Sequence, residues 1–188
     1  MSSRIVPTDR VIRINPGSRF PDIRLSVVGG GEASLAASEG RPKLIVVYRG
    51  AFCPFCQGSL TEINNKLGDL EASNFDVIAV SADKQDVAEK LVRDLNLRFP
   101  VAYGLEEDVM RVLGLYVSDP TNYIEQKHRF AEPGYFVLNP ENQLKYVALS
   151  SHPMGGRVNV DALLAGYNWS QGRIKEAPEF ASVFWGSA

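Results

Sequence analysis

The sequence predicts an α/β fold in which a mixed β-sheet carries helices on both of its faces. Two largely apolar runs, at residues 43–48 and 76–81, are each followed by a segment with helical periodicity. Such alternation is typical of parallel strands joined by crossover helices. Two further apolar runs, at 135–138 and 144–149, are separated only by turn-forming residues, 139–142. These runs predict an antiparallel hairpin, so the sheet should contain both kinds of strand pairing.

The residues that precede this alternation are predicted to form an N-terminal extension. Turn-forming sequences punctuate it, at residues 16–17 and in the glycine run 29–31. Between them, apolar and polar side chains alternate over residues 23–27, which predicts a short strand or hairpin. We therefore interpret residues 1–188 as a single domain with an extension over residues 1–40.

The segments after the apolar runs have the spacing of amphipathic helices. From Cys56 to Leu70, apolar residues recur in steps of four and three, which places them on one helical face. Further helices are predicted at 84–95, 105–113 and 160–169. Residues 99–102 should form a short extended piece and residues 116–132 a long connection. The tail, residues 176–188, carries three aromatic side chains. These side chains are expected to pack either on the same domain or on a second subunit, and in the second case the protein would be a homodimer.

Length, charge and composition exclude several classes of protein. A chain of 188 residues with 45% apolar side chains can bury a core without disulfide staples. The net charge of −2 gives no electrostatic basis for binding nucleic acid or an anionic membrane. No signal-peptide core is visible, and the apolar run at 44–48 is too short to cross a bilayer. We therefore expect a cytoplasmic protein.

Cys53 and Cys56, the two cysteines of the chain, form a Cys-x-x-Cys motif between a predicted strand and a predicted helix. In a cytoplasmic chain this context favours redox chemistry over a structural bridge. The positive end of the helix should stabilise a thiolate at Cys53, the outer sulfur, which makes it the nucleophile. Arg49 adds positive charge if its loop folds back. Cys56 lies on the apolar face, so it should stay protonated and resolve the mixed disulfide.

Two other readings of the motif stay open. A structural zinc site needs four ligands, and the remaining soft ligands, His128 and His152, lie far downstream. Inert packing of both thiols fits Cys56 better than Cys53. Both histidines are expected on the surface or in loops. No metal or organic cofactor is expected.

The order and spacing of several segments resemble the thioredoxin-like superfamily. More narrowly, they resemble the peroxiredoxin-like redoxins of the alkyl hydroperoxide reductase and thiol-specific antioxidant group. The matching segments, within about residues 16–150, are Phe20-Pro21-Asp22-Ile23, Leu44–Tyr48 with Cys53–Cys56, Val77–Asp83 and Pro133–Leu138. The resemblance implies a thioredoxin-like fold. It also implies that Pro133 matches the cis-proline that faces the motif in thioredoxins and shapes their substrate groove.

The chain departs from the peroxiredoxin pattern around the first cysteine. Val46 and Gly50 stand where typical peroxiredoxins carry proline and threonine, and Pro133 stands where they carry an arginine. Arg49 or Arg129 would have to supply the missing charge.

Three functions follow from these observations. The leading hypothesis is a thiol-dependent oxidoreductase with a Cys53/Cys56 couple, acting on a disulfide-bearing protein and recycled by a thioredoxin system or glutathione. The alternative is a peroxiredoxin-like peroxidase in which a hydroperoxide oxidises Cys53 to a sulfenic acid. The third is a redox-sensing binding module without turnover.

Overall fold

The computed structural model describes residues 14–121, 125 and 127–173. The predicted aromatic tail, residues 176–188, lies outside these residues, as do the first 13 residues of the N-terminal extension. The extent of the single domain over residues 1–188 therefore stays a prediction.

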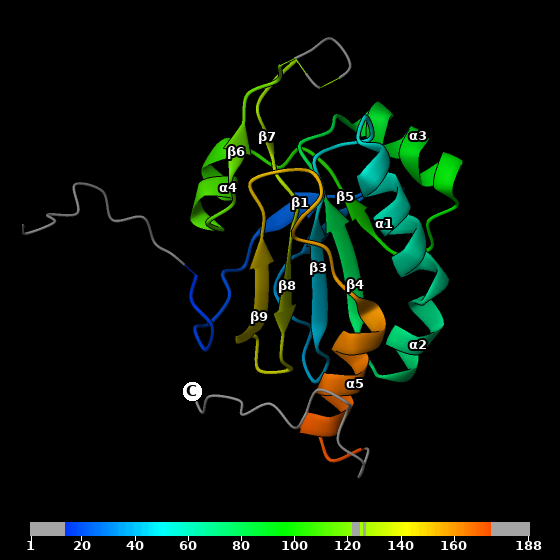
Figure 1. The fold of residues 1–188 in the computed structure, drawn as a ribbon, viewed down its shortest axis with the longest axis vertical. Coiled ribbons are helices and arrows are strands. Elements are labelled where there is room, and N and C mark those ends of the chain that lie inside the picture. Colours follow the sequence, from blue (N-terminus) through cyan, green and yellow to red (C-terminus); the bar gives the residue numbers. More distant parts are fainter. Residues whose placement is uncertain (1–13, 122–124, 126, 174–188) are drawn as a thin grey trace, which may run out of the picture.

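A five-stranded mixed sheet forms the centre of the fold, in the order β5-β4-β3-β8-β9 (Figure 1). Its strands are β3 (Lys43–Val47), β4 (Asp76–Val80), β5 (Val101–Ala102), β8 (Gly134–Leu138) and β9 (Leu144–Leu149). β3 pairs in parallel with β4 and antiparallel with β8, and β8 and β9 form the antiparallel hairpin. The predicted mixed sheet is confirmed.

Helices cover both faces of this sheet, as the sequence predicts. They are α1 (Pro54–Asn65), α2 (Leu67–Ala72), α3 (Gln85–Leu95), α4 (Glu107–Val112) and α5 (Val160–Ser170). Side chains of β3 alternate between two apolar clusters: Leu44 and Val46 pack with α1, α2, α3 and α5, whereas Ile45 and Val47 pack with α4 and the N-terminal segment. Figure 1 shows α1, α2 and α3 along the β4 side of the sheet and α4 on the β9 side.

The single helix predicted from Cys56 to Leu70 is wrong, because it is divided at Lys66. The carbonyl oxygen of Asn64, which a continuous helix would pair with the amide of Gly68, accepts a hydrogen bond from Arg98 at 2.9 Å. The Asn64 side chain also accepts from the backbone N–H of Arg98, at 2.9 Å. The apolar stripe survives the break, since Leu67 and Leu70 are buried.

Two short antiparallel ladders accompany the central sheet. β1 (Arg24–Ser26) and β2 (Glu32–Ser34) confirm the N-terminal hairpin, and its turn contains three consecutive glycines with positive φ, residues 29–31. β6 (Val117–Ser118) and β7 (Phe130–Ala131) pair within residues 116–132, for which the sequence predicts a long connection. No helix in the described part of the chain is long and apolar enough to span a membrane.

Candidate active site

Cys53 is the N-cap residue of α1, directly after the loop that leaves β3. Its Sγ accepts a hydrogen bond from the backbone N–H of Cys56 at 3.4 Å, and its carbonyl oxygen accepts from the same N–H at 3.0 Å. Pro54 occupies the first helical turn, where a missing N–H costs no hydrogen bond. The sulfur thus stands where a capping oxygen usually stands, at the positive end of the helix.

Both cysteines are free thiols, and both are buried. Cys53 is 1% exposed and Cys56 0% exposed. An exposed outer sulfur at Cys53 is therefore not what the structure has, because the Cys53 Sγ accepts from the Cys56 N–H and belongs to the buried apolar cluster. Burial alone would fit inert packing, so the electrostatics of the pair decide what the thiols can do.

The two thiols have opposite acidities. The side-chain hydrogen bond from Cys56 lowers the pKa of Cys53 from 9.0 to about 6, against burial, with help from the Cys56 backbone N–H and from Arg49. The same hydrogen bond, burial and the negative charge on Cys53 raise the pKa of Cys56 far above its usual range. Near neutral pH the pair carries one proton, on Cys56, and one negative charge, on Cys53. An inert buried thiol would instead have a raised pKa.

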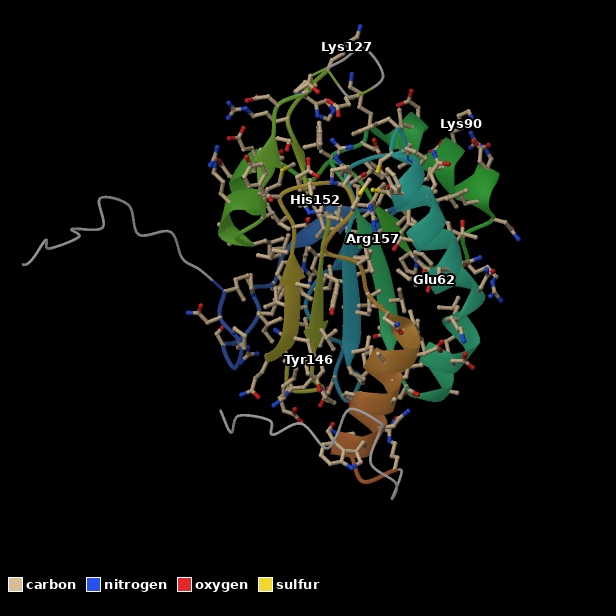
Figure 2. The ribbon with its side chains drawn as sticks, in the orientation of Figure 1. Glu62, Lys90, Lys127, Tyr146, His152 and Arg157 are labelled. Carbon is tan, nitrogen blue, oxygen red and sulfur yellow. The ribbon has the colours of Figure 1, made fainter. Side chains whose placement is uncertain are left out.

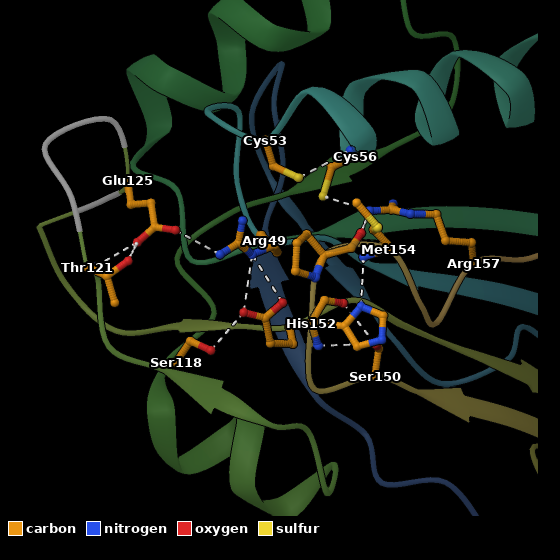
Figure 3. Close-up of polar contacts among 12 residues, drawn as sticks. Arg49, Cys53, Cys56, Ser118, Thr121, Glu125, Ser150, His152, Met154 and Arg157 are labelled. Carbon is orange, nitrogen blue, oxygen red and sulfur yellow. Dashed lines mark hydrogen bonds and ion pairs between the residues drawn. The ribbon is translucent and has the colours of Figure 1, made fainter.

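Arg49 is held beside Cys53 by two carboxylates (Figure 3). Its Nε lies 3.2 Å and 3.1 Å from the two carboxylate oxygens of Glu132, and its Nη2 lies 2.9 Å from Glu125. The guanidinium also stacks over Phe52 and Phe130, 5.2 Å and 4.7 Å from the ring centroids. These contacts fix the cation whose hydrogen bond and charge lower the pKa of Cys53.

Sequence reasoning missed Glu132 and Glu125 as partners of this arginine. A signal existed for Glu132, because Val47 pairs with Gly134 across the antiparallel β3–β8 ladder. Residues that follow β3 must then lie beside residues that precede β8, which brings Arg49 to Glu132. Glu125 lies in the predicted connection, where no periodicity could place it.

The cis peptide predicted at Pro133 is wrong, because the described residues contain no cis peptide bond. The trans linkage continues β7 directly into β8, and the Glu132 N–H on this path donates to the carbonyl of Tyr116 at 2.8 Å. Pro133 precedes a strand paired on both sides, and its own carbonyl accepts from the Ser150 N–H at 2.9 Å. The residue therefore contacts the loop that follows β9.

A buried carboxylate, Asp83, supports the loop before Cys53. It is 2% exposed, and its Oδ2 accepts hydrogen bonds from the Ala51 N–H at 3.0 Å and the Ser81 hydroxyl at 2.8 Å. Burial raises the pKa of Asp83. The neighbouring phenol, Tyr48, also has a pKa raised by burial and by the charge of Asp83. Sequence reasoning assigned this aspartate no role.

The histidines lie outside the thiol pair. The ring of His152 accepts a hydrogen bond from the Met154 N–H in the loop between β9 and α5 (Figure 2), and the ring of His128 contacts the carbonyl of Arg129. Arg129, the other arginine considered for the missing charge, is 48% exposed and pairs with Asp119 and Glu107. Among the described residues, no cluster of three or more His, Cys, Asp or Glu side chains could hold a metal ion.

Comparison with known proteins identifies the family. Residues 16–147 match the family model described as AhpC/TSA. A protein of Mycobacterium tuberculosis named as a peroxiredoxin is 26% identical over 107 residues, which cover 57% of this chain and 68% of that protein.

Solved structures show the same fold. Peroxiredoxin 6 of Arenicola marina superimposes with a TM-score of 0.71 at 18% identity, covering 88% of this chain and 79% of the other. AhpC of Mycobacterium bovis gives 0.70 at 16% identity, covering 88% and 97%. The predicted thioredoxin-like fold is confirmed, and the chain belongs to the AhpC/TSA family of thiol-dependent oxidoreductases.

Proposed function

We propose that this chain is a thiol-dependent peroxidase in which Cys53 reduces a hydroperoxide and Cys56 then closes a disulfide with it. The observation that carries the proposal is the pairing of an acidified Cys53 with a protonated Cys56 in one turn of helix. Relatives named as peroxiredoxins support the substrate class.

In the first step the Cys53 thiolate attacks one oxygen of the hydroperoxide. The O–O bond breaks, the sulfur becomes a sulfenic acid, and the leaving oxygen takes up a proton to become an alcohol or water. The fixed guanidinium of Arg49 stabilises the charge that moves from sulfur to oxygen. Arg49 thereby takes the role of the threonine and the arginine that typical peroxiredoxins carry where this chain has Gly50 and Pro133.

In the second step the Cys56 sulfur attacks the sulfenic acid. An S–S bond forms, the S–O bond breaks, and the proton of Cys56 leaves with the hydroxyl as water. The two side chains already share a hydrogen bond across one helical turn, so little movement is needed. An external dithiol, or two thiol molecules, then reduces the disulfide.

Burial of Cys53 favours a small oxidant over a protein substrate. At 1% exposure the sulfur is reached by a small hydroperoxide after a local opening, whereas a mixed disulfide with a folded protein needs a larger one. Disulfide exchange is the second candidate, because two apolar side chains are exposed, Phe55 within the motif and Met154 in the loop whose Arg157 contacts Cys56, and they offer a partner surface.

Steady-state assays separate the candidates. Purified protein is supplied with hydrogen peroxide or cumene hydroperoxide and a thioredoxin system, and separately with insulin and dithiothreitol. We expect saturable peroxide consumption that Cys53→Ser abolishes and Cys56→Ser slows at the closing step. Insulin reduction without peroxide consumption would establish disulfide exchange instead, and oxidation of one equivalent without turnover would establish a redox sensor.

The reductant, compartment and assembly are also proposals. We propose a thioredoxin system or glutathione as the electron source in the cytoplasm, and a homodimer as the assembly to test. Replacing the thioredoxin system by glutathione in the same assay identifies the reductant, and analytical ultracentrifugation of the oxidised and reduced protein reports the assembly.

A further inference from the structure

A second arginine reaches the thiol pair from the opposite side of the motif. Arg157 lies between β9 and α5, and its Nη2 donates to the Sγ of Cys56 over 3.6 Å (Figure 3). The same nitrogen donates to the carbonyl of Pro153. Arg49 faces Cys53 and Arg157 faces Cys56, so each sulfur has its own cation.

The loop that carries Arg157 is fixed against the sheet. Gly156 has a φ of +63°, and a Cβ on it would lie 2.3 Å from the carbonyl oxygen of Pro133, so only glycine fits without displacement. The Ser150 N–H donates to that same carbonyl at 2.9 Å. Val158, the residue after the arginine, is 6% exposed and belongs to the apolar cluster of both cysteines. The loop that brings the guanidinium to the sulfur is thus packed against the sheet on one side and the apolar cluster on the other.

Within the described part of the chain, the charge of Arg157 has no acidic partner. Arg49 is paired with Glu125 and Glu132, which disperse its positive charge. No salt bridge joins Arg157 to a described carboxylate, and its side-chain hydrogen bonds go to the Pro153 carbonyl and the Cys56 sulfur. Cys56 is therefore the acidic group that this half-buried cation faces.

We propose that Arg157 is a catalytic residue of the closing step, in which it stabilises the Cys56 thiolate as that sulfur attacks oxidised Cys53. The inference rests on the proposed function for the peroxide reaction, and it applies equally to a mixed disulfide on Cys53. It assigns the two arginines to two successive nucleophiles.

Arg157 lowers the pKa of Cys56 with less opposition once Cys53 is oxidised. In the reduced pair, the hydrogen bond and negative charge of Cys53 raise the pKa of Cys56, while the Arg157 hydrogen bond lowers it. Once Cys53 is a sulfenic acid or a mixed disulfide, its sulfur is neutral, so its hydrogen bond and its charge no longer raise the pKa of Cys56. Hydrogen bonds from the Arg49 backbone and the Arg157 side chain then lower the pKa of Cys56 against burial, and Arg157 supplies the side-chain cation beside the sulfur as the proton leaves.

The step can be followed with a probe that does not depend on peroxide. The Cys53 thiolate attacks the aromatic disulfide DTNB and releases one thionitrobenzoate, leaving a mixed disulfide. Cys56 then attacks the Cys53 sulfur, forms the protein disulfide and releases a second thionitrobenzoate. Absorbance resolves the two releases in stopped flow, and a parallel experiment traps the Cys53 sulfenic acid with dimedone after one equivalent of hydrogen peroxide.

We expect Arg157→Met to slow the second release by about threefold to tenfold and to move its pH profile upward. One pKa unit removes about tenfold of the thiolate, and the greater nucleophilicity of a more basic thiolate returns about half of that on a logarithmic scale. Arg157→Lys should restore part of the rate. Arg173→Met is the matched control, because Arg173 follows α5 and stacks on Tyr167. This substitution should leave both releases of thionitrobenzoate unchanged.

Three outcomes would overturn the inference: an unchanged second release in Arg157→Met, an equal and pH-independent slowing in the Met and Lys variants, or no second release in the unmodified protein. The peroxide arm tests the proposed function separately. If peroxide leaves Cys53 thiol unreacted while DTNB closure depends on Arg157, the peroxidase proposal fails and this inference stands.

Discussion

The acidity of Cys53 depends above all on the thiol of Cys56, and two substitutions isolate that dependence. Cys56→Ala removes the side-chain donor, whereas Cys56→Ser keeps a hydroxyl donor at the same position. Neither variant can close the disulfide, so they differ mainly in the hydrogen bond to the Cys53 sulfur. The backbone N–H of residue 56 remains in both variants.

The magnitude follows from the pKa of Cys53, which falls from 9.0 to about 6. The three units correspond to about 4 kcal/mol, and the Cys56 side chain is the largest contributor. Loss of about one to two of these units in Cys56→Ala would reduce the thiolate fraction at pH 7 from about 90% to between about 50% and about 10%. Cys56→Ser should fall between this variant and the unmodified protein.

The assay is the rate of alkylation of Cys53 by iodoacetamide from pH 4 to pH 10, with the modified residue located by mass spectrometry. The account predicts midpoints that rise from the unmodified protein to Cys56→Ser and then to Cys56→Ala. Identical midpoints in all three proteins would refute the reasoning, since the acidity of Cys53 would then arise from the helix terminus and Arg49 alone.

Three further predictions concern the surroundings of the pair. Arg49→Met leaves Glu132, which is 3% exposed, without its cation, so urea denaturation should show that the free energy of unfolding falls by about 3–5 kcal/mol. Stopped flow should show a slower reaction of Cys53 with peroxide. An unchanged free energy of unfolding would argue against the buried ion pair. Gly156→Ala should destabilise the fold by about 1–3 kcal/mol and slow disulfide closure, because its Cβ meets the Pro133 carbonyl. Thermal melts measure both this variant and Gly166→Ala, which lies in open space within α5 and should be neutral or stabilising. Equal effects of the two substitutions would contradict the loop geometry. Because Cys53 has a lowered pKa, its thiolate contributes to the free energy of unfolding fully above pH 9, and this contribution is lost as the pH falls through about 6. The difference in the free energy of unfolding between the unmodified protein and Cys53→Ala, measured under reducing conditions, should therefore grow from pH 6 to pH 9. A difference that does not change with pH would contradict the lowered pKa.

Periodicity predicted the architecture well, because burial on two faces leaves a clear pattern. The run at 44–47 is apolar throughout, and the whole strand 43–47 is buried between parallel and antiparallel neighbours, as a central strand should be. The helix break at Lys66 left no such pattern, since it depends on Arg98 reaching a backbone carbonyl from a distant loop. Apolar spacing reports which side chains are buried, and it carries no information on which carbonyl a distant arginine takes.

The candidate site was predicted less completely than the fold. The Cys-x-x-Cys spacing placed Cys53 at the helix N-terminus and Cys56 on the apolar face, where the structure has them. It could not show that the Cys53 sulfur is buried, because exposure at an N-cap depends on which loops cover it. Arg157 lies 101 residues from Cys56 along the chain, so only the folded β8–β9 hairpin and its following loop bring the two together.

The predicted cis linkage failed for a related reason. A proline before a strand is compatible with both isomers, and the choice depends on tertiary contacts such as the Tyr116–Glu132 and Pro133–Ser150 hydrogen bonds. Those contacts join segments that no local sequence pattern connects.

The central claim, that Cys53 reacts with hydroperoxide as an activated thiolate, is tested most directly by mixing fully reduced protein with one equivalent of hydrogen peroxide at pH 7. The account predicts oxidation far faster than that of free cysteine, with a product that has lost the mass of two hydrogen atoms and contains a Cys53–Cys56 disulfide. Oxidation at the rate of free cysteine, or a product without that disulfide, would contradict it.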